Sequence, residues 1–287
     1  MIEKALGDHL VAHSELTDFL ATYMESPAVF YAEAPDDSKP GWGAGPQYGR
    51  IVFDIDLQGD SERTMGGILA VDILCKKDEQ YPEDIEPIVR RLIHGYFFSS
   101  GKFIVAAQWR DSKSFDEPER MVAGFTVFFD LLAFPILTTN GLDVISRLNE
   151  WTSQIEKLYV INHDELPTAA WKPGKGESAI YWRRLRVTPA AKIRDTYATI
   201  WRTDTIKGHI FSEDIATASA VADDLTIRLY TAKRLLKPGE APIMVADRNT
   251  QDDGADPLRT GQLTVEATYG INRHRAATAT FQNIKYE

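Results

Sequence analysis

A short sequence pattern occurs twice in the chain, once in each half. Residues 110–112 read Arg-Asp-Ser and lead to Glu-Pro-Glu-Arg at 117–120, while residues 248–250 read Arg-Asn-Thr and lead to Asp-Pro-Leu-Arg at 256–259. Both copies combine an Arg, an Asp or Asn and a hydroxyl residue with a following acid-Pro-x-Arg sequence. These residue types also populate unrelated turns, so a duplication is indicated only if the surrounding elements repeat as well.

The first half of the 287-residue chain alternates between helical and extended patterns. Apolar residues at spacings of three and four predict an amphipathic helix from Ile2 to Tyr23. A second helix is expected at 82–96, because acids stand in its first turn and arginines near its end, as the helix dipole favours. Alternating apolar residues predict strands, the first two close enough to form a hairpin, at 50–57, 68–74, 103–110 and 121–132.

The second half repeats this order of elements. Apolar spacing predicts a helix from Val144 to Leu158. A further helix begins at residues 212–214 and stops within 233–239, and its buried side is expected to carry Ile215, Val221, Leu225 and Leu229. The strands predicted for this half lie at 180–187, 197–211, 243–248 and 262–271.

Together the patterns predict an α+β fold of two similar units, each an antiparallel sheet with helices packed on one face. The units are expected to span residues 1–137 and 138–287, the second being a divergent duplicate of the first. Because the strands come in pairs, a doubly wound nucleotide-binding fold is not expected.

Composition restricts the surroundings and the partners of the chain. The formal net charge is −10, which disfavours binding to nucleic acid, itself a polyanion. A single cysteine, Cys75, excludes an intramolecular disulfide and a cysteine-based zinc cluster and suits a reducing cytoplasm. The most apolar segment, 125–142, is interrupted by Asp130 and Pro135, and the N-terminus lacks a targeting signal. We therefore expect neither a membrane span nor export.

Several motifs that carry chemistry in other proteins are present only in part. His9 and His13 have the spacing of two metal ligands on a helix, but no Glu follows His9 as in metalloproteases, so no metal is expected. The Gly-rich segments 41–45 and 172–178 precede strands and lack the order of a phosphate loop. Neither Gly-x-Ser-x-Gly nor a plausible Cys/His arrangement occurs. We expect no enzymatic activity and no cofactor.

One predicted strand is locally basic. In an otherwise acidic protein, Trp182 is followed by Arg183, Arg184 and Arg186. Such a strand suits contact with an acidic partner, or the protection of a sheet edge against aggregation, better than binding to nucleic acid.

The N-terminal half resembles a known family of virion proteins. The resemblance rests on Glu15-Leu16-x-x-Phe19-Leu20, on the segments 27–31 and 34–35, and on Pro-Gln-Tyr-Gly-Arg-Ile-Val-Phe at 46–53. These are similar to the tail-terminator, or tail-completion, proteins of long-tailed bacteriophages. The resemblance covers residues 1 to about 135, and extends to the second half only through the order of helices and strands.

This resemblance implies a structural role in a virion tail or neck, with assembly in the bacterial cytoplasm. Terminators of this kind form hexameric rings that cap the tail tube, stop its polymerisation and offer a surface to the head-completion or connector protein. A tandem chain implies a trimer that imitates six subunits, or a hexamer with the second unit decorating the ring. Loops 36–49, 110–120 and 248–259 are the expected contact regions, with Trp42, Arg110, Arg120, Arg184, Arg248 and Arg259 as candidate contacts.

Two alternatives stay open. The chain is also compatible with a small-molecule-binding protein or enzyme whose two halves enclose a pocket, with Trp42, Trp109 and Trp182 as its lining. The other alternative is a different structural component of a phage neck or tail that uses the same unit.

Overall fold

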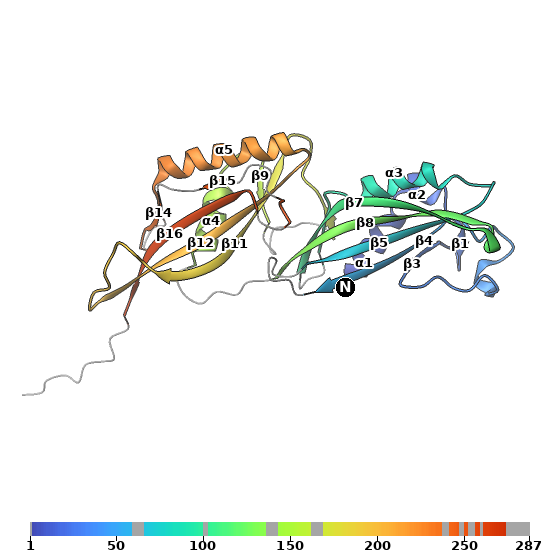
Figure 1. Cartoon of the computed structure of the whole chain (residues 1–287), viewed down its shortest axis with the longest axis horizontal. Helices are drawn as coiled ribbons and strands as arrows, with labels where there is room; N and C mark the ends of the chain where they lie inside the picture. The colour runs from blue at the N-terminus through green and yellow to red at the C-terminus, as the bar shows by residue number, and fades with distance from the viewer. Residues whose placement is uncertain are drawn as a thin grey trace, which may run out of the picture.

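The computed structural model describes residues 2–58, 66–99, 103–135, 143–161, 169–236, 241–246, 250–251, 256–258 and 261–273. Two seven-stranded sheets lie next to each other along the longest axis of the molecule (Figure 1). The first half of the chain builds most of one sheet and the second half builds the other, and we call these halves the first and second units.

The first unit contains helices α1 (Ile2–Val11), α2 (Ser14–Thr17) and α3 (Pro82–Ile93), with short 3-10 turns at Pro40–Trp42 and Pro118–Arg120. A small hairpin pairs β1 with β2, and the large sheet contains β3 to β8. The strands are β1 (Thr22–Tyr23), β2 (Ser26–Pro27), β3 (Val29–Tyr31), β4 (Arg50–Gln58), β5 (Gly66–Lys76), β6 (Phe97–Ser99), β7 (Phe103–Glu117) and β8 (Val122–Pro135).

The second unit contains helices α4 (Val144–Thr152) and α5 (Ile215–Ala232). The Asp214 carboxylate caps α5 by accepting a hydrogen bond from the Thr217 backbone N–H, as expected for a helix that begins at residues 212–214. The strands are β9 (Leu158–Val160), β10 (Ala170–Trp171), β11 (Ser178–Pro189), β12 (Thr199–Ser212), β13 (Arg234–Leu235), β14 (Ile243–Val245), β15 (Thr250–Gln251) and β16 (Leu263–Asn272).

The two large sheets share one topology. The spatial order β3-β4-β5-β8-β7-β6 in the first unit matches β9-β11-β12-β16-β14-β13 in the second. In both, the first pair of this order is parallel and the remaining pairs are antiparallel. The α+β prediction of two similar units is confirmed, with one correction: each sheet has a parallel pair at its edge, so neither is wholly antiparallel.

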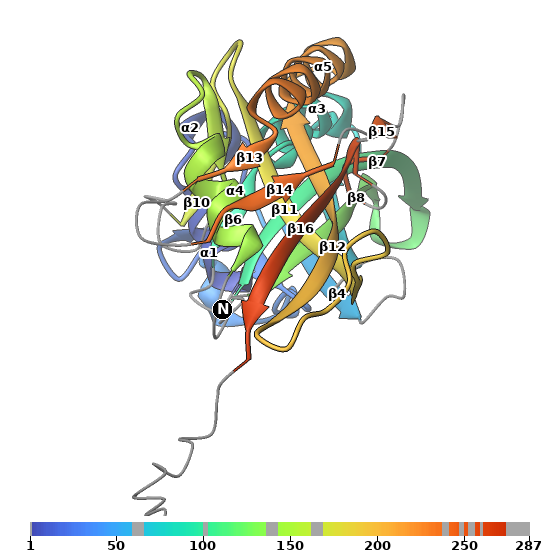
Figure 2. The same ribbon diagram turned by 90° about the vertical axis from the view of Figure 1, so that its left-hand side faces the viewer.

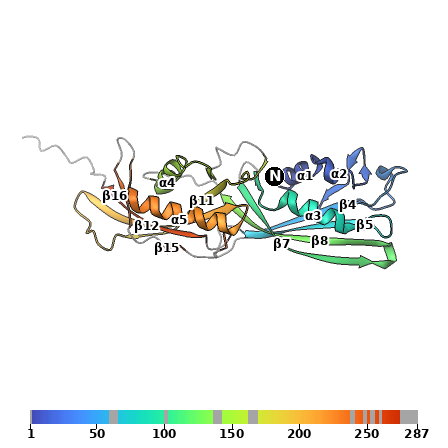
Figure 3. The same cartoon turned by 90° about the horizontal axis from the view of Figure 1, so that it is seen from above.

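Each sheet buries one face against its helices. In the first unit, Leu6 of α1 and Val89 of α3 pack with Val71 and Val127 of the central strands. In the second unit, Leu148 of α4 and Leu225 of α5 pack with Ile206 and Val265. Alternation along the strands puts these core residues on one face only. In Figure 3, α1 and α4 lie on the same side of the two sheets.

The two units are joined by an apolar junction and by a shared strand. Phe134 of β8 packs on Tyr181 of β11, with ring centroids 4.2 Å apart, and Phe97 of β6 packs on Phe211 of β12 at 5.1 Å. In addition, β10 from the second half pairs antiparallel with β6, so Ala170–Trp171 extend the first sheet. The Ser99 backbone N–H also donates to the Ala169 carbonyl at 2.8 Å.

Two predicted helices are shorter than expected. The apolar stripe from Ile2 to Tyr23 is divided between α1 and α2, and Tyr23 belongs to β1, where its ring packs on Trp42. Helix α4 ends at Thr152, and Leu158 begins β9. In both cases the spacing of apolar residues continues beyond the helix end. The later residues are apolar for a different reason, which is that they fill other parts of the core.

Two further expectations are wrong. Residues 110–117 are not a loop: they continue β7, whose register with β8 runs to Glu117 opposite Val122. The outer part of this hairpin was not predicted, because residues 111–114 are polar and strands were predicted from alternating apolar residues. Ile215 does not face the core of its unit: it is 81% exposed in the first turn of α5, and Ala218, Ala222, Leu225 and Leu229 form the buried side.

Candidate functional site

The predicted contact residues fall at three separate places. Trp42 and Arg120 lie near the outer end of the first unit, Arg110 lines a cleft between the units, and Arg184 is partly exposed and paired with the buried Asp204 of the second unit. Arg248 and Arg259 lie outside the described residues.

Trp42 is 3% exposed and fills a small aromatic core of its own. Its ring lies 4.9 Å from that of Tyr23 and 5.8 Å from that of Phe30, and its indole N–H donates to the Asp36 carbonyl at 3.1 Å. In this conformation the indole is not available to a partner. The 36–49 segment is nevertheless a loop with a single 3-10 turn, as predicted.

A charged network ties this loop to the tip of the β7–β8 hairpin. The Arg50 side chain is only 2% exposed and donates to Asp37 at 2.8 Å. The Tyr48 hydroxyl also donates to Asp37 at 2.8 Å, and Arg120 lies 3.8 Å from the same carboxylate. Burial opposes ionisation of Asp37, but the hydrogen bonds from Tyr48 and Arg50 outweigh it and hold the pKa of Asp37 below its usual value.

Arg184 has an internal partner rather than an exposed one. Its Nε lies 2.7 Å from Asp204 Oδ2, and its Nη2 lies 3.7 Å from Asp143 Oδ1. Asp204 is fully buried and also accepts a hydrogen bond from the Tyr269 hydroxyl at 3.0 Å. Burial raises the pKa of Asp204, whereas Arg184 acts in the opposite direction. A role in neutralising the buried Asp204 is therefore favoured for Arg184 over contact with a partner.

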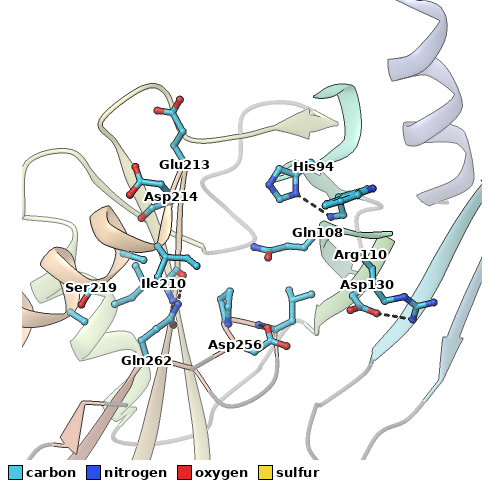
Figure 4. Close-up of a pocket in the computed structure, with 17 residues that line it drawn as sticks. His94, Gln108, Arg110, Asp130, Ile210, Glu213, Asp214, Ser219, Asp256 and Gln262 are labelled. Atoms are coloured by element: carbon cyan, nitrogen blue, oxygen red, sulfur yellow. Dashed lines mark hydrogen bonds and ion pairs between the residues drawn. The ribbon is translucent and has the colours of Figure 1, made fainter. Parts of the chain in front are cut away.

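A cleft of about 520 Å³ lies between the two units (Figure 4). The first sheet contributes Gln108 and Asp130 from its helix-free face, and the start of α5 contributes Ile215 and Ala218. Its other lining residues are His94, Trp109, Arg110, Ile210, Ser212, Glu213, Asp214, Ser219, Ala222, Asp256, Pro257, Leu258 and Gln262.

Most polar groups on the first-unit wall of this cleft are already engaged. The Trp109 backbone N–H donates to Nδ1 of His94 at 3.1 Å. Burial, together with the nearby Lys172 and Arg90, lowers the pKa of His94, so the imidazole is neutral at pH 7. Arg110 lies 3.4 Å from Asp130, as the dashed line in Figure 4 marks, and its guanidinium covers the Phe128 ring at 5.4 Å.

The cleft only partly matches the pocket expected between the halves. Of the three tryptophans predicted to line it, Trp109 does so and is 37% exposed. Trp42 is buried in its own aromatic core, and Trp182 is buried in the second unit, where its indole N–H donates to Thr152 Oγ1 at 3.0 Å.

The partial motifs of the sequence have structural explanations. His9 donates from Nε2 to the Leu92 carbonyl at 2.8 Å and packs between His13 and Tyr96. No group of three or more His, Cys, Asp or Glu side chains is placed to hold a metal ion in the described part of the chain. Burial raises the pKa of the Cys75 thiol to about 12, which makes it an inert core residue. No helix among the described residues is long and apolar enough to cross a membrane.

Sequence reasoning missed one residue that joins the units. Trp171 of β10 packs on Phe97, with ring centroids 5.6 Å apart, and on Tyr159 at 5.3 Å. A signal for it exists in the sequence, because Trp171 stands nine residues before Ile180 just as Trp42 stands nine residues before Ile51.

Comparisons with known proteins add no assignment. No model of a protein family matches the chain. No curated protein and no solved structure matches it either.

Proposed function

We propose that the chain is a structural phage or prophage protein that completes the tail tube by forming a ring and joins the tube to the head connector. The observation that carries this proposal is the shared topology of the two large sheets, joined in tandem by an apolar junction. A chain of two equivalent units supplies two positions of a ring, so three copies supply the six positions of a hexameric terminator.

A ring also needs a different contact surface at each end of the chain, because its subunits meet head to tail. The two outer ends differ in this chain. The first unit carries the Trp42 loop and the β7–β8 hairpin tip at its outer end, whereas the second unit carries the β11–β12 hairpin at its outer end and has the short strand β13 at the edge of its sheet (Figure 1). The proposed partners are other copies of the chain, the tail tube protein and the head-completion protein.

The test uses tail tubes from the phage that carries the gene. Purified protein is added to tubes assembled in its absence, and tube length and end structure are followed by electron microscopy. A terminator stops further growth and caps one end of each tube. Tubes that keep growing and stay uncapped would contradict the proposal, and binding along the sides of the tube would favour another neck or tail component.

A second candidate function rests on the cleft between the units. Its volume, and Trp109 in its wall, suit a small-molecule site. Ligand-induced quenching of tryptophan fluorescence, present in the wild type and absent in Trp109→Phe, would support this function. Unchanged emission across a library of metabolites would count against it.

A further inference from the structure

The strand registers place the two units on one common frame. If Ile51 of β4 is set equivalent to Ile180 of β11, their partners Ile73 and Ile210 become equivalent too. The strand registers then give the remaining equivalent positions of the two sheets. Phe129 is equivalent to Val265, Ala106 to Met244, Phe97 to Arg234 and Phe98 to Leu235.

Backbone hydrogen bonds support this frame independently. In the first unit the Ala107 N–H donates to the Tyr96 carbonyl at 3.0 Å. At the equivalent positions of the second unit, the Val245 N–H donates to the Lys233 carbonyl at 2.9 Å. Phe98 and Leu235, which the frame makes equivalent, are both buried in the helix-covered cores of their units.

On the same frame Trp42 is the counterpart of Trp171. Both lie in the connection that leaves the parallel edge strand, β3 or β9, and returns as β4 or β11. The connection of the second unit crosses to the first unit, where Ala170–Trp171 pair with Phe97–Phe98. The connection of the first unit does not cross to the other unit: Trp42 is folded back on Tyr23 and Phe30.

Strand β6, which the β10 segment extends, has β13 as its counterpart in the second unit. In the described part of the structure, no strand pairs with the outer edge of β13. Strand β13 is the last in its sheet, as Figure 2 shows beside β14 and β16. In the first unit the outward N–H of Ser99 is used by the added segment, through the Ala169 carbonyl. Its counterpart is Leu236, which is 75% exposed directly after β13. An edge strand with outward N–H groups is a template for a further strand.

We propose that the 36–49 loop of one copy adds to the β13 edge of a second copy, as the β10 segment adds to β6 within the chain. This inference rests on the proposed ring function and names the contact between its copies. Gly41 would pair with Leu235 and Trp42 with Arg234. The Trp42 indole would then cover the Arg234 guanidinium, where Trp171 covers Phe97 within the chain, and an aromatic ring and a guanidinium attract each other in this arrangement.

The loop has to leave its present position to make this contact, and its composition allows that. Residues 40–46 contain three glycines and two prolines, so Trp42 is the one large side chain that anchors this segment. A Cβ added at Gly41 would lie 2.4 Å from the Tyr23 ring, so a side chain there is incompatible with the folded-back conformation unless Tyr23 moves. Gly41→Val should therefore release the loop toward an extended conformation.

The test is sedimentation velocity of the full chain over a range of concentrations. Leu236→Pro removes the outward N–H of the β13 edge, while Leu236→Ala keeps it and is the matched control. The wild type and Leu236→Ala are expected to self-associate to the same extent, Leu236→Pro to shift association to at least tenfold higher concentration, and Gly41→Val to associate at lower concentration than the wild type.

Two results would overturn the pairing. Equal association of Leu236→Pro and Leu236→Ala would place the contact elsewhere and leave the ring function standing. If the wild type and Gly41→Val both stay monomeric, the proposed contact between copies does not exist. The experiment with tail tubes would then test the ring function separately.

Discussion

Trp42 and Trp171 occupy equivalent positions in two units of the same topology but pack in different places. Trp42 is buried in its own unit, whereas Trp171 packs on Phe97 of the other unit. The connection of the second unit reaches the first unit of its own chain, and under the proposed pairing the connection of the first unit would reach the second unit of another copy.

Phe134 should be the residue on which the junction between the units depends most. It is 1% exposed and its ring contacts Tyr181 and Phe211 of the second unit. Phe134→Ala is expected to lower the free energy of unfolding by about 3–5 kcal/mol. Denaturant titration checks this, with Phe128→Ala on the half-buried helix-free face as the control. Equal losses in both variants would contradict the assignment.

The pair of Arg184 and Asp204 should stabilise the second unit. Arg184→Ala leaves a fully buried carboxylate without its cation, which costs about 3–5 kcal/mol in other proteins. Arg186 is a neighbouring exposed residue, and Arg186→Ala should change the free energy of unfolding by no more than about 0.5 kcal/mol. Chemical denaturation of both variants separates a core role of Arg184 from a surface role, since a surface residue would behave like Arg186.

Acid should destabilise the second unit through His209. Burial lowers the pKa of this histidine to about 4, and its Nδ1–H donates to the Pro257 carbonyl. The folded state therefore binds the proton less readily than the unfolded state. The stability contribution is complete above the unfolded pKa of about 6.5 and is lost as the pH falls from there to about 4, by roughly 3 kcal/mol.

The measurement for His209 is a series of urea titrations between pH 7.5 and 4. His209→Asn keeps a donor near the position of Nδ1 but cannot titrate, so its stability should fall less over this range than that of the wild type. Parallel curves for the two proteins would show that another group causes the acid sensitivity.

Gly124 should be required for the β7–β8 hairpin. A Cβ at this position would lie 2.0 Å from the Ile73 carbonyl oxygen and 2.4 Å from the Phe115 ring. Gly124→Ala is expected to cost about 1–3 kcal/mol, because part of this contact is with backbone that cannot rotate away. Gly45→Ala, where an added Cβ meets nothing within 4 Å, is the control and should be nearly neutral in thermal unfolding.

The sequence predicted the order of elements well, because apolar spacing reports which residues face a core. It extended the first helix to Tyr23 because Leu16 and Tyr23 continue the spacing while filling different parts of the structure. It missed the outer part of the hairpin, where Ser112 and Ser114 alternate with other polar residues. Pattern analysis has no signal for such a segment, since its pairing with β8 is decided by backbone hydrogen bonds.

The candidate contacts were less predictable than the fold. Arg184 has the composition of an exposed basic strand, yet its partner Asp204 stands twenty residues further along the chain and only the β11–β12 register brings the two together. Likewise, Arg110 belongs to the cleft because the second unit packs nearby, and neither unit alone contains that information.

Electron microscopy of tail tubes incubated with the protein tests the central claim most directly. The account predicts a ring on one end of each tube, built from three chains and showing six similar lobes, and no further tube growth. Free, growing tube ends in the presence of excess protein would contradict it.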